Sequence, residues 1–219
     1  MRVATISTQP FHDRIEAGLA LAEALRHYAD RDDVVVLGLP RGGVPIANEI
    51  ASKLDSPLDV LVVGKLGVPG HEELAMGAIA SGGVCLTNQD VVRQLDIPQS
   101  TVDAVARHEE IELERRERLY RGARAPRQLQ GRVAILVDDG LATGSTMRAA
   151  IVAARKQGPA RIVVAAPVGA PSTCRELALD ADEVVCVRMP DPFFAVGLWY
   201  SDFTPTSDQE VRELLEQHR

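Results

Sequence analysis

The sequence predicts an α/β fold: a central, mainly parallel sheet with helices on both of its faces. Two observations support this prediction. Apolar runs of strand length alternate along the chain with segments of helical periodicity. The runs are apolar throughout rather than at every second residue, which is typical of strands buried on both faces. Because ligands bind outside the carboxyl ends of strands in such sheets, the loops that follow the strands are the first candidates for a site.

The first part of the chain is expected to form two strands and two helices. Apolar residues at helical spacing predict a helix over 11–28, and a valine-rich run predicts a strand over 34–39. A helix over 45–54 begins with Pro45, a residue that suits the first helical turn. A second strand covers 58–63, and the glycine-containing stretch 65–70 is expected to be a loop.

The second part continues the alternation after a long polar helical segment over 88–120, which is interrupted at Pro98. We expect one domain over 1–219, with a helical insertion at about 88–130 and a hood at about 188–205. The remaining predicted elements are a strand at 133–137, a helix at 145–157, a strand at 161–166, a helix at 171–179, a strand at 183–187 and a terminal helix at 207–219 with a capping box.

Composition and charge restrict the partners of the chain. Its formal net charge of −7 disfavours nucleic acid and anionic membranes, and no apolar run approaches the ~20 residues of a membrane span. The first residues lack the apolar core of a signal peptide. Cys85, Cys174 and Cys186 form no zinc or disulfide pattern, so we expect reduced thiols in a cytoplasmic protein that acts on soluble small molecules.

The segment after the third strand carries the strongest chemical signal. Asp138 and Asp139 directly follow an apolar strand, and a short loop rich in Gly, Thr and Ser then opens a helix. Backbone N–H groups and the dipole at a helix start attract an anion. Two carboxylates would repel a phosphate unless they face ribose hydroxyls or a Mg²⁺ ion. A sugar phosphate with a neighbouring pyrophosphate meets both requirements, whereas a simple N-cap and turn accounts for one Asp and one Gly.

This segment resembles the signature of type I phosphoribosyltransferases, which bind phosphoribosyl pyrophosphate (PRPP). The shared pattern is an apolar strand, two acidic residues and a small loop ending Thr-Gly-x-Thr, and its Leu-Ala-Thr-Gly wording is closest to adenine-type enzymes. The resemblance implies that the two aspartates hold the ribose hydroxyls and face Mg²⁺, directly or indirectly, while 142–146 cradles the 5-phosphate. The implied PRPP-binding residues are Asp138, Asp139, Gly140, Leu141, Ala142, Thr143, Gly144, Ser145 and Thr146.

Two further positions resemble the pyrophosphate side of such a site. Pro40, Arg41, Gly42 and Gly43 follow the first strand and are similar to the family's pyrophosphate loop, which often carries a non-proline cis peptide. We therefore expect an unusual backbone near Arg41, whose charge would stabilise the leaving group. Lys65, just past the second strand, resembles a residue that contacts pyrophosphate or the base; the alternative is an ordinary loop lysine. Arg41 and Lys65 are the predicted catalytic residues.

The aromatic stretch at 189–200 is similar to the base-binding hood of hypoxanthine-guanine enzymes. Its candidate base-binding residues are Phe193, Phe194, Val196 and Trp199, with the stacking ring left open. The alternative is a small satellite hydrophobic cluster.

Two other roles are less defined. Ala142 stands where hypoxanthine-guanine enzymes have an aspartate base, so His71, Glu72 or Glu73 could serve instead. For a lid we expect Tyr120 to Gln130, in which Arg121 and Arg124 lack neighbouring glutamates and could swing onto pyrophosphate. The alternative is a loop whose arginines only keep it soluble.

Nearly the whole chain also resembles a group of bacterial phosphoribosyltransferase-like proteins with no settled substrate, through stretches such as Phe11-x-Asp13-Arg14 and 191–203. The resemblance implies transfer of a phosphoribosyl group to a nitrogenous base, purine favoured, with release of pyrophosphate and with Mg²⁺ as cofactor. The alternatives are a PRPP- or nucleotide-sensing regulator without transferase activity, and a phosphosugar or nucleotide hydrolase. The expected partners are PRPP and a small base; a homodimer is left open.

Overall fold

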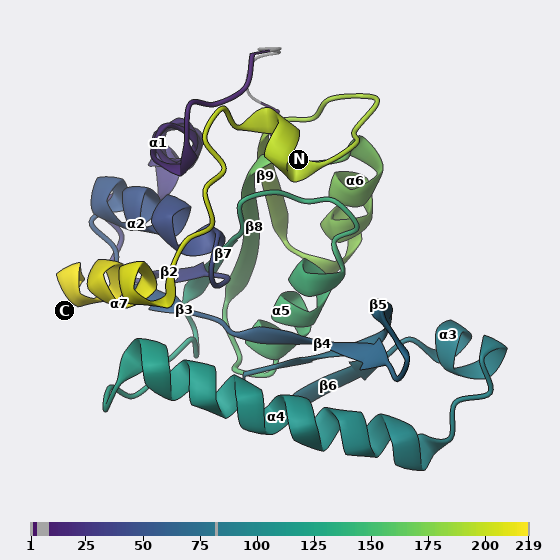
Figure 1. The fold of residues 1–219 in the computed structure, drawn as a ribbon. Coiled ribbons are helices and arrows are strands. Elements are labelled where there is room, and N and C mark those ends of the chain that lie inside the picture. Colours follow the sequence, from purple (N-terminus) through teal and green to yellow (C-terminus); the bar gives the residue numbers. More distant parts are fainter. Residues whose placement is uncertain (1, 4–8, 82, 219) are drawn as a thin grey trace.

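The centre of the structure is a six-stranded sheet in which every neighbouring pair of strands is parallel (Figure 1). The computed structural model describes residues 2–3, 9–81 and 83–218. The strand order is β1-β9-β8-β7-β2-β3. The bounds are Arg2–Val3 (β1), Val34–Gly38 (β2), Leu58–Val60 (β3), Val133–Val137 (β7), Arg161–Val168 (β8) and Glu183–Arg188 (β9). The predicted parallel sheet is confirmed, and β1 is an addition to it.

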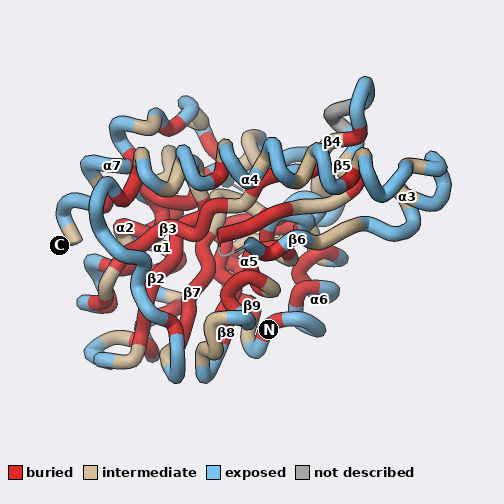
Figure 2. The backbone as a smooth tube through the Cα atoms, turned by 90° about the horizontal axis from the view of Figure 1, so that it is seen from below, coloured by how far each residue is buried: buried red, intermediate tan, exposed pale blue. Residues whose placement is uncertain are grey.

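Helices cover both faces of this sheet, as the unbroken apolar strands predicted. Val34 and Val36 pack in one buried cluster with α1 and α2, while Val35 and Leu37 pack in a second cluster with α5 and α6. The alternation follows from the two-residue period of a strand. Buried residues therefore run through the strands and inner helix faces (Figure 2). The helices are Arg14–Ala24 (α1), Gly43–Leu54 (α2), Ser145–Arg155 (α5) and Pro171–Asp180 (α6), with a 3₁₀ turn at Arg26–Tyr28 (η1).

A second, antiparallel sheet contradicts the predicted loop at 65–70. It consists of β4 (Val63–Val68), β5 (His71–Ala80) and β6 (Val84–Thr87). Buried and more exposed residues alternate along β4, as expected of a strand with one covered face. Gly64, Gly67 and the turn at Gly70, where φ is 79°, looked like loop signals in the sequence. An isolated window could not show that β5 supplies the pairing partner.

The second sheet and the long helix form an arm beside the parallel sheet. Asn88 caps the short helix α3 (Gln89–Gln94), and Pro98 precedes α4 (Gln99–Arg121), so the predicted helical segment and its break are confirmed. Helix α4 packs on one side of the small sheet and α5 on the other. None of the helices in the described ranges is long and apolar enough to cross a membrane.

The C-terminal segment packs beside the stretch that begins at Phe11. An irregular stretch with a 3₁₀ turn, η2 (Val196–Trp199), leads to α7 (Asp208–Gln217). Phe11 donates its backbone N–H to Trp199 O at 2.8 Å. Helix α7 packs on α2 and α4, and the Ser207 hydroxyl accepts the Glu210 N–H at 3.1 Å, which confirms the predicted start of the terminal helix.

Candidate functional site

The two predicted phosphate-binding loops meet at the carboxyl edge of β2 and β7. Leu39 donates its backbone N–H to Val137 O at 2.8 Å, so the loop after β2 lies against the loop after β7. A Cβ atom on Gly42 would lie 2.0 Å from Asp139 Oδ2, and one on Gly43 would lie 2.4 Å from Val137 O. Two consecutive glycines are therefore required by close approach. The Pro40–Arg41 peptide is cis, which confirms the predicted backbone departure.

Asp138 is a partly buried carboxylate with few internal partners. Its Oδ1 atom accepts the backbone N–H of Asp139 at 2.9 Å. Burial, and then the negative charge of Asp139, raise the pKa of Asp138 well above its ordinary value. The charged form of this carboxylate is therefore disfavoured here, and hydroxyl donors or a cation from a ligand would favour it.

Asp139 is held in place by residues that the sequence analysis did not select as site residues. Arg14, in the first turn of α1, donates from Nη2 to Asp139 Oδ2 at 2.8 Å and from Nη1 to Thr204 O at 2.8 Å. The Arg14 guanidinium also lies 4.1 Å from the centre of the Phe203 ring. Tyr200 donates its hydroxyl proton to Asp139 O at 2.7 Å, and burial raises the pKa of Tyr200, which keeps it a donor. These residues lie in the stretches 11–14 and 191–203, which the sequence marked by their resemblance to bacterial relatives, but the sequence did not show that they contact Asp139.

The loop from 141 to 146 is fixed from the side of β8 and α6. Leu141 donates its backbone N–H to Val168 O at 2.9 Å, and the Thr173 hydroxyl donates to Ala142 O at 2.5 Å. Gly144 has a φ of 74°, a conformation that favours glycine, directly before α5. Three hydroxyl-bearing residues of the loop are exposed: Thr143, Ser145 and Thr146. The start of α5 therefore presents hydroxyls and a helix N-terminus to solvent, as an anion site requires.

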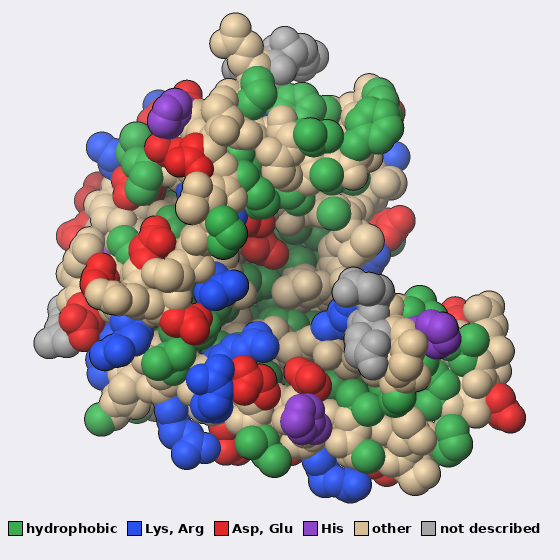
Figure 3. Space-filling view, in the orientation of Figure 1, with side chains coloured by type: hydrophobic (Ala, Val, Ile, Leu, Met, Phe, Trp, Pro, Cys, Tyr) green, Lys and Arg blue, Asp and Glu red, His purple; other side chains and the backbone are tan. Residues whose placement is uncertain are grey.

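The predicted catalytic residues lie on different parts of the molecule. Arg41 is 51% exposed, with Nη1 3.9 Å from Asp208 Oδ1 at the start of α7. Lys65 is exposed on β4, in a strand of the arm rather than in a loop. Figure 3 shows a hollow between the parallel-sheet body and this arm. His71 is exposed at the start of β5; the side chains of Glu72 and Glu73 lie outside the described part.

The predicted hood contacts the segment after β7 at Val196 as well as through the Tyr200 hydroxyl. A Cβ atom on Gly140 would lie 2.5 Å from Val196 Cγ1, so these two residues are in direct contact. Phe193 and Trp199 pack partly against the main buried cluster, whereas Phe194 is 79% exposed. Of the three candidate rings, Phe194 is the one most open to a ligand.

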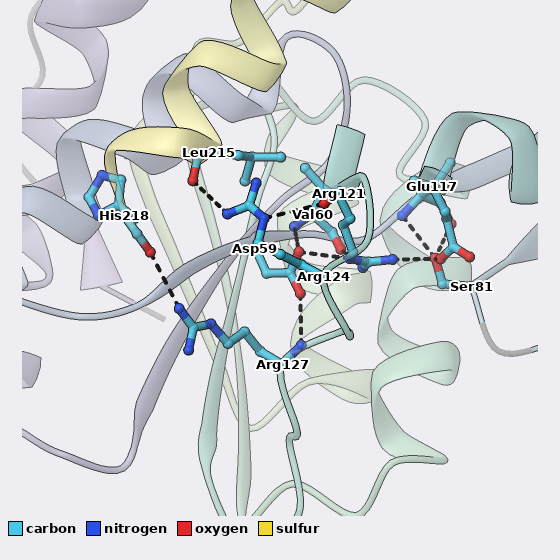
Figure 4. Close-up of polar contacts among 10 residues, drawn as sticks. Asp59, Val60, Ser81, Glu117, Arg121, Arg124, Arg127, Leu215 and His218 are labelled. Carbon is cyan, nitrogen blue, oxygen red and sulfur yellow. Dashed lines mark hydrogen bonds and ion pairs between the residues drawn. The ribbon is translucent and has the colours of Figure 1, made fainter. Parts of the chain in front are cut away.

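The structure contradicts the premise of the predicted lid, because its arginines are already engaged (Figure 4). Arg121 is 8% exposed and donates to Asp59 Oδ1 at 2.9 Å and to Glu117 Oε1 at 3.0 Å. Arg124 donates from Nη1 to Leu215 O at 2.9 Å. These residues lie near the amino ends of β2 and β3, away from the phosphate loop. Glu117 is four residues before Arg121, so the expectation that Arg121 lacks a neighbouring glutamate was wrong, whereas Asp59 is 62 residues away and leaves no local signal in the sequence.

The carboxylates near the site determine how a magnesium ion would be held. Among the described residues there is no group of three or more His, Cys, Asp or Glu side chains that could hold a metal. Asp138 and Asp139 are the two candidates, and Asp139 already pairs with Arg14. Magnesium is commonly held by one or two carboxylates together with substrate phosphates and water. The residues present fit that arrangement.

Comparison with known proteins gives a consistent result. Residues 11–75 and 70–201 match the family profile of the phosphoribosyl transferase domain. Proteins from two strains of Mycobacterium tuberculosis, each named as a candidate phosphoribosyl transferase, are 50% identical over 210 residues, covering 95% of this chain and 47% of theirs. The chain thus spans about half the length of these curated relatives.

Solved structures agree with this match. The crystal structure of TT1426 from Thermus thermophilus superposes with a TM-score of 0.82 at 40% identity, covering 96% of this chain and 99% of that one. The AQ2163 protein from Aquifex aeolicus, at 13% identity and a TM-score of 0.51 over 92% of this chain and 83% of its own, shares the fold.

Proposed function

The chain belongs to the phosphoribosyl transferase family, and from that premise we propose that it binds PRPP and transfers its phosphoribosyl group to a nitrogenous base. The observation that carries the proposal is the partly buried pair Asp138–Asp139 between a glycine-rich loop at a helix start and the Arg41 loop. A phosphate alone would not need two carboxylates. A ribose with phosphates on both sides uses every part of this arrangement.

Each part of the site then has one task. Asp138 and Asp139 accept the ribose hydroxyls, and the loop at 142–146 binds the 5-phosphate through hydroxyls and the start of α5. Arg41 and Lys65 approach the pyrophosphate from the body and the arm. When Mg²⁺ is bound together with PRPP, it would neutralise part of the negative charge of the pyrophosphate.

The reaction replaces one bond at C1 of the ribose by another. The bond from C1 to the pyrophosphate oxygen breaks, and a bond from C1 to a nitrogen of the base forms. The transition state resembles an oxocarbenium ion, so this chain contributes by orienting the two reactants and stabilising the departing pyrophosphate. We favour a purine acceptor, because Val196 of the hood contacts Gly140 of the site and the same segment carries the exposed ring of Phe194.

One assay series tests the proposal against its alternatives. PRPP with Mg²⁺ is titrated by calorimetry, and pyrophosphate release is then measured with purines and pyrimidines, with Asp138→Asn/Asp139→Asn as the inactive control. We expect pyrophosphate when PRPP and one base are both present. Tight PRPP binding with no release for any base would identify a sensor instead. Products from PRPP or a nucleotide without a base would identify a hydrolase. Absence of PRPP binding would refute the site.

A screen of bases by thermal shift narrows the acceptor. A ligand at about 100 times its dissociation constant stabilises a protein by ~2.7 kcal/mol. Each base is tested with Mg²⁺ and PRPP, and the base that adds the largest stabilisation is the first candidate for the release assay.

A further inference from the structure

A cavity of about 620 Å³ lies at the edge of the parallel sheet opposite the phosphate loop. Its walls come from the first residues of β2 and β3, from the connection after α4 and from Arg132, which immediately precedes β7. We propose that this cavity is a second ligand site, separate from the PRPP site, and that it binds a nucleoside phosphate. The proposal does not rest on the function proposed above.

The lining of the cavity is positively charged. The chain has a net charge of −7, yet the cavity is lined by four arginines and a single aspartate. Figure 3 shows Lys and Arg side chains gathered at the end of α4 that lies beside α7. Concentrating positive charge in a concave site of an acidic protein attracts anions to that site. The lining arginines are Arg121, Arg124, Arg127 and Arg132.

The four arginines divide into two kinds. Arg121 forms the floor, because the carboxylates of Asp59 and Glu117 neutralise it. The other three contact main-chain carbonyl oxygens in the described structure: Arg124 reaches Leu215 O, Arg127 reaches His218 O and Arg132 reaches Asp32 O. A carbonyl oxygen has no net charge, so three guanidinium charges at the rim are not neutralised by the contacts they make. The Asp33 carboxylate is already paired with Arg31, whose hydrogen bond is the chief cause of the lowered pKa of Asp33; the charge of Arg132 contributes less.

The rim contacts are also easy to exchange. The bond from Arg127 to His218 O is 3.3 Å long and the bond from Arg132 to Asp32 O is 3.4 Å long, both beyond the usual range for N–H···O bonds. A phosphate oxygen would offer a shorter, charge-assisted bond to the same planar groups. These two arginines can therefore turn to an anion while Arg121 keeps the floor in place.

The apolar part of the lining indicates what the phosphate is attached to. The apolar wall of the cavity is formed by Pro57, Ala125 and Pro126, together with Val35 and Leu58, which are themselves buried. Free phosphate or pyrophosphate would leave that wall without a partner, whereas the ring of a nucleoside would cover it. A volume of about 620 Å³ lies within the usual range for small-molecule sites.

The test uses ADP as the probe, in a background that lacks the two carboxylates assigned to the ribose of PRPP. Calorimetry in the Asp138→Asn/Asp139→Asn background should give saturable binding of one ADP per chain. Adding Arg127→Ala or Arg132→Ala should weaken binding about tenfold, because each removes a charge-assisted bond. Arg93→Ala and Arg155→Ala, in exposed ion pairs on α3 and α5, are the matched controls and should leave ADP affinity unchanged.

Three outcomes would overturn the proposal. One is the absence of saturable ADP binding at millimolar concentration in that background. The second is an equal loss of affinity in the control variants, which would reflect net charge alone. The third is unchanged affinity in both rim variants, with folding checked by circular dichroism; Arg132→Gln replaces any rim variant that fails to fold. Because the background lacks the PRPP carboxylates, none of these results depends on whether PRPP binds.

Discussion

Asp59, buried in β3, and Asp138, partly buried directly after β7, are both carboxylates of the same parallel sheet, but the protein satisfies them to different degrees. Each accepts the backbone N–H of the following residue, at 2.8 Å for Asp59 and 2.9 Å for Asp138. Asp59 also accepts Arg121 Nε at 2.9 Å and the Arg127 backbone N–H at 2.9 Å. The pKa of Asp138 is instead raised, first by loss of contact with water and then by the like charge of Asp139 beside it.

The different number of hydrogen bonds that the chain makes to Asp59 and Asp138 indicates that Asp59 stabilises the fold and that Asp138 is available to a ligand. A carboxylate whose acceptor capacity is filled by the chain stabilises the fold and has little left for a ligand. A carboxylate held near a like charge destabilises the unliganded protein, and a site that binds a polar ligand can retain it. The predictions below test this contrast, from the largest expected effect to the smallest.

Asp59→Ala should have the largest effect on stability. It leaves the Arg121 guanidinium, 8% exposed, without its Asp59 partner, and breaking a buried pair in this way costs about 3–5 kcal/mol. Urea denaturation monitored by circular dichroism measures the loss. Asp33→Ala removes an exposed partner of Arg31 and is the control, with an expected loss of ~0–1 kcal/mol. Equal losses for the two variants would contradict a structural role for Asp59.

Asp138→Asn/Asp139→Asn should weaken PRPP binding by about 100-fold, which corresponds to ~2.8 kcal/mol, because the ligand hydroxyls lose two charged acceptors. The circular dichroism spectrum should remain that of the unmodified chain. Asp103→Asn, on α4, is the control and should bind PRPP normally. Unchanged PRPP affinity in the double variant would place the ligand elsewhere.

The same contrast explains which features were predictable from the sequence. The strand Val133–Val137, the two aspartates and the glycine-rich loop are consecutive, so one window carries the whole signal. The pair of Asp59 and Arg121 joins residues from different elements, so neither the predicted lid nor its alternative, a soluble surface loop, included the buried network that the structure has. Arg14 reaches Asp139 across 125 positions and was missed for the same reason. The β4–β5 pairing was hidden by glycines that looked like turns.

Gly140→Ala tests the contact between phosphate loop and hood. The added Cβ would lie 2.5 Å from Val196 Cγ1, and overpacking of this kind costs about 1–3 kcal/mol. We expect PRPP affinity to fall about tenfold as the loop or the hood shifts. Combining it with Val196→Ala removes the two clashing methyl groups and should restore part of the affinity. Additive losses in the double variant would mean that the two residues do not interact.

Asp138→Asn alone should stabilise the protein without ligand, although the effect is small. An amide at this position still accepts the Asp139 N–H through its oxygen but carries no charge beside Asp139. We expect a gain of ~1 kcal/mol at neutral pH, or about 2–4 °C in Tm for a chain of this size, together with weaker PRPP binding.

The pH dependence of that gain follows from the direction of the pKa shift. Because the folded pKa of Asp138 is raised above the ordinary value, the folded chain binds this proton more tightly than the unfolded chain. Stability from this group is fully present below about pH 3.9, the unfolded value, and is lost as the pH rises through the folded pKa. The advantage of Asp138→Asn should therefore be smallest at low pH and grow to a plateau at higher pH.

Asp139→Asn is the matched comparison, since it removes the partner of Arg14 and should lower Tm at neutral pH. Thermal unfolding of both variants from pH 3 to pH 8 decides the matter: an advantage for Asp138→Asn that does not change with pH would mean that its source is packing rather than the buried charge.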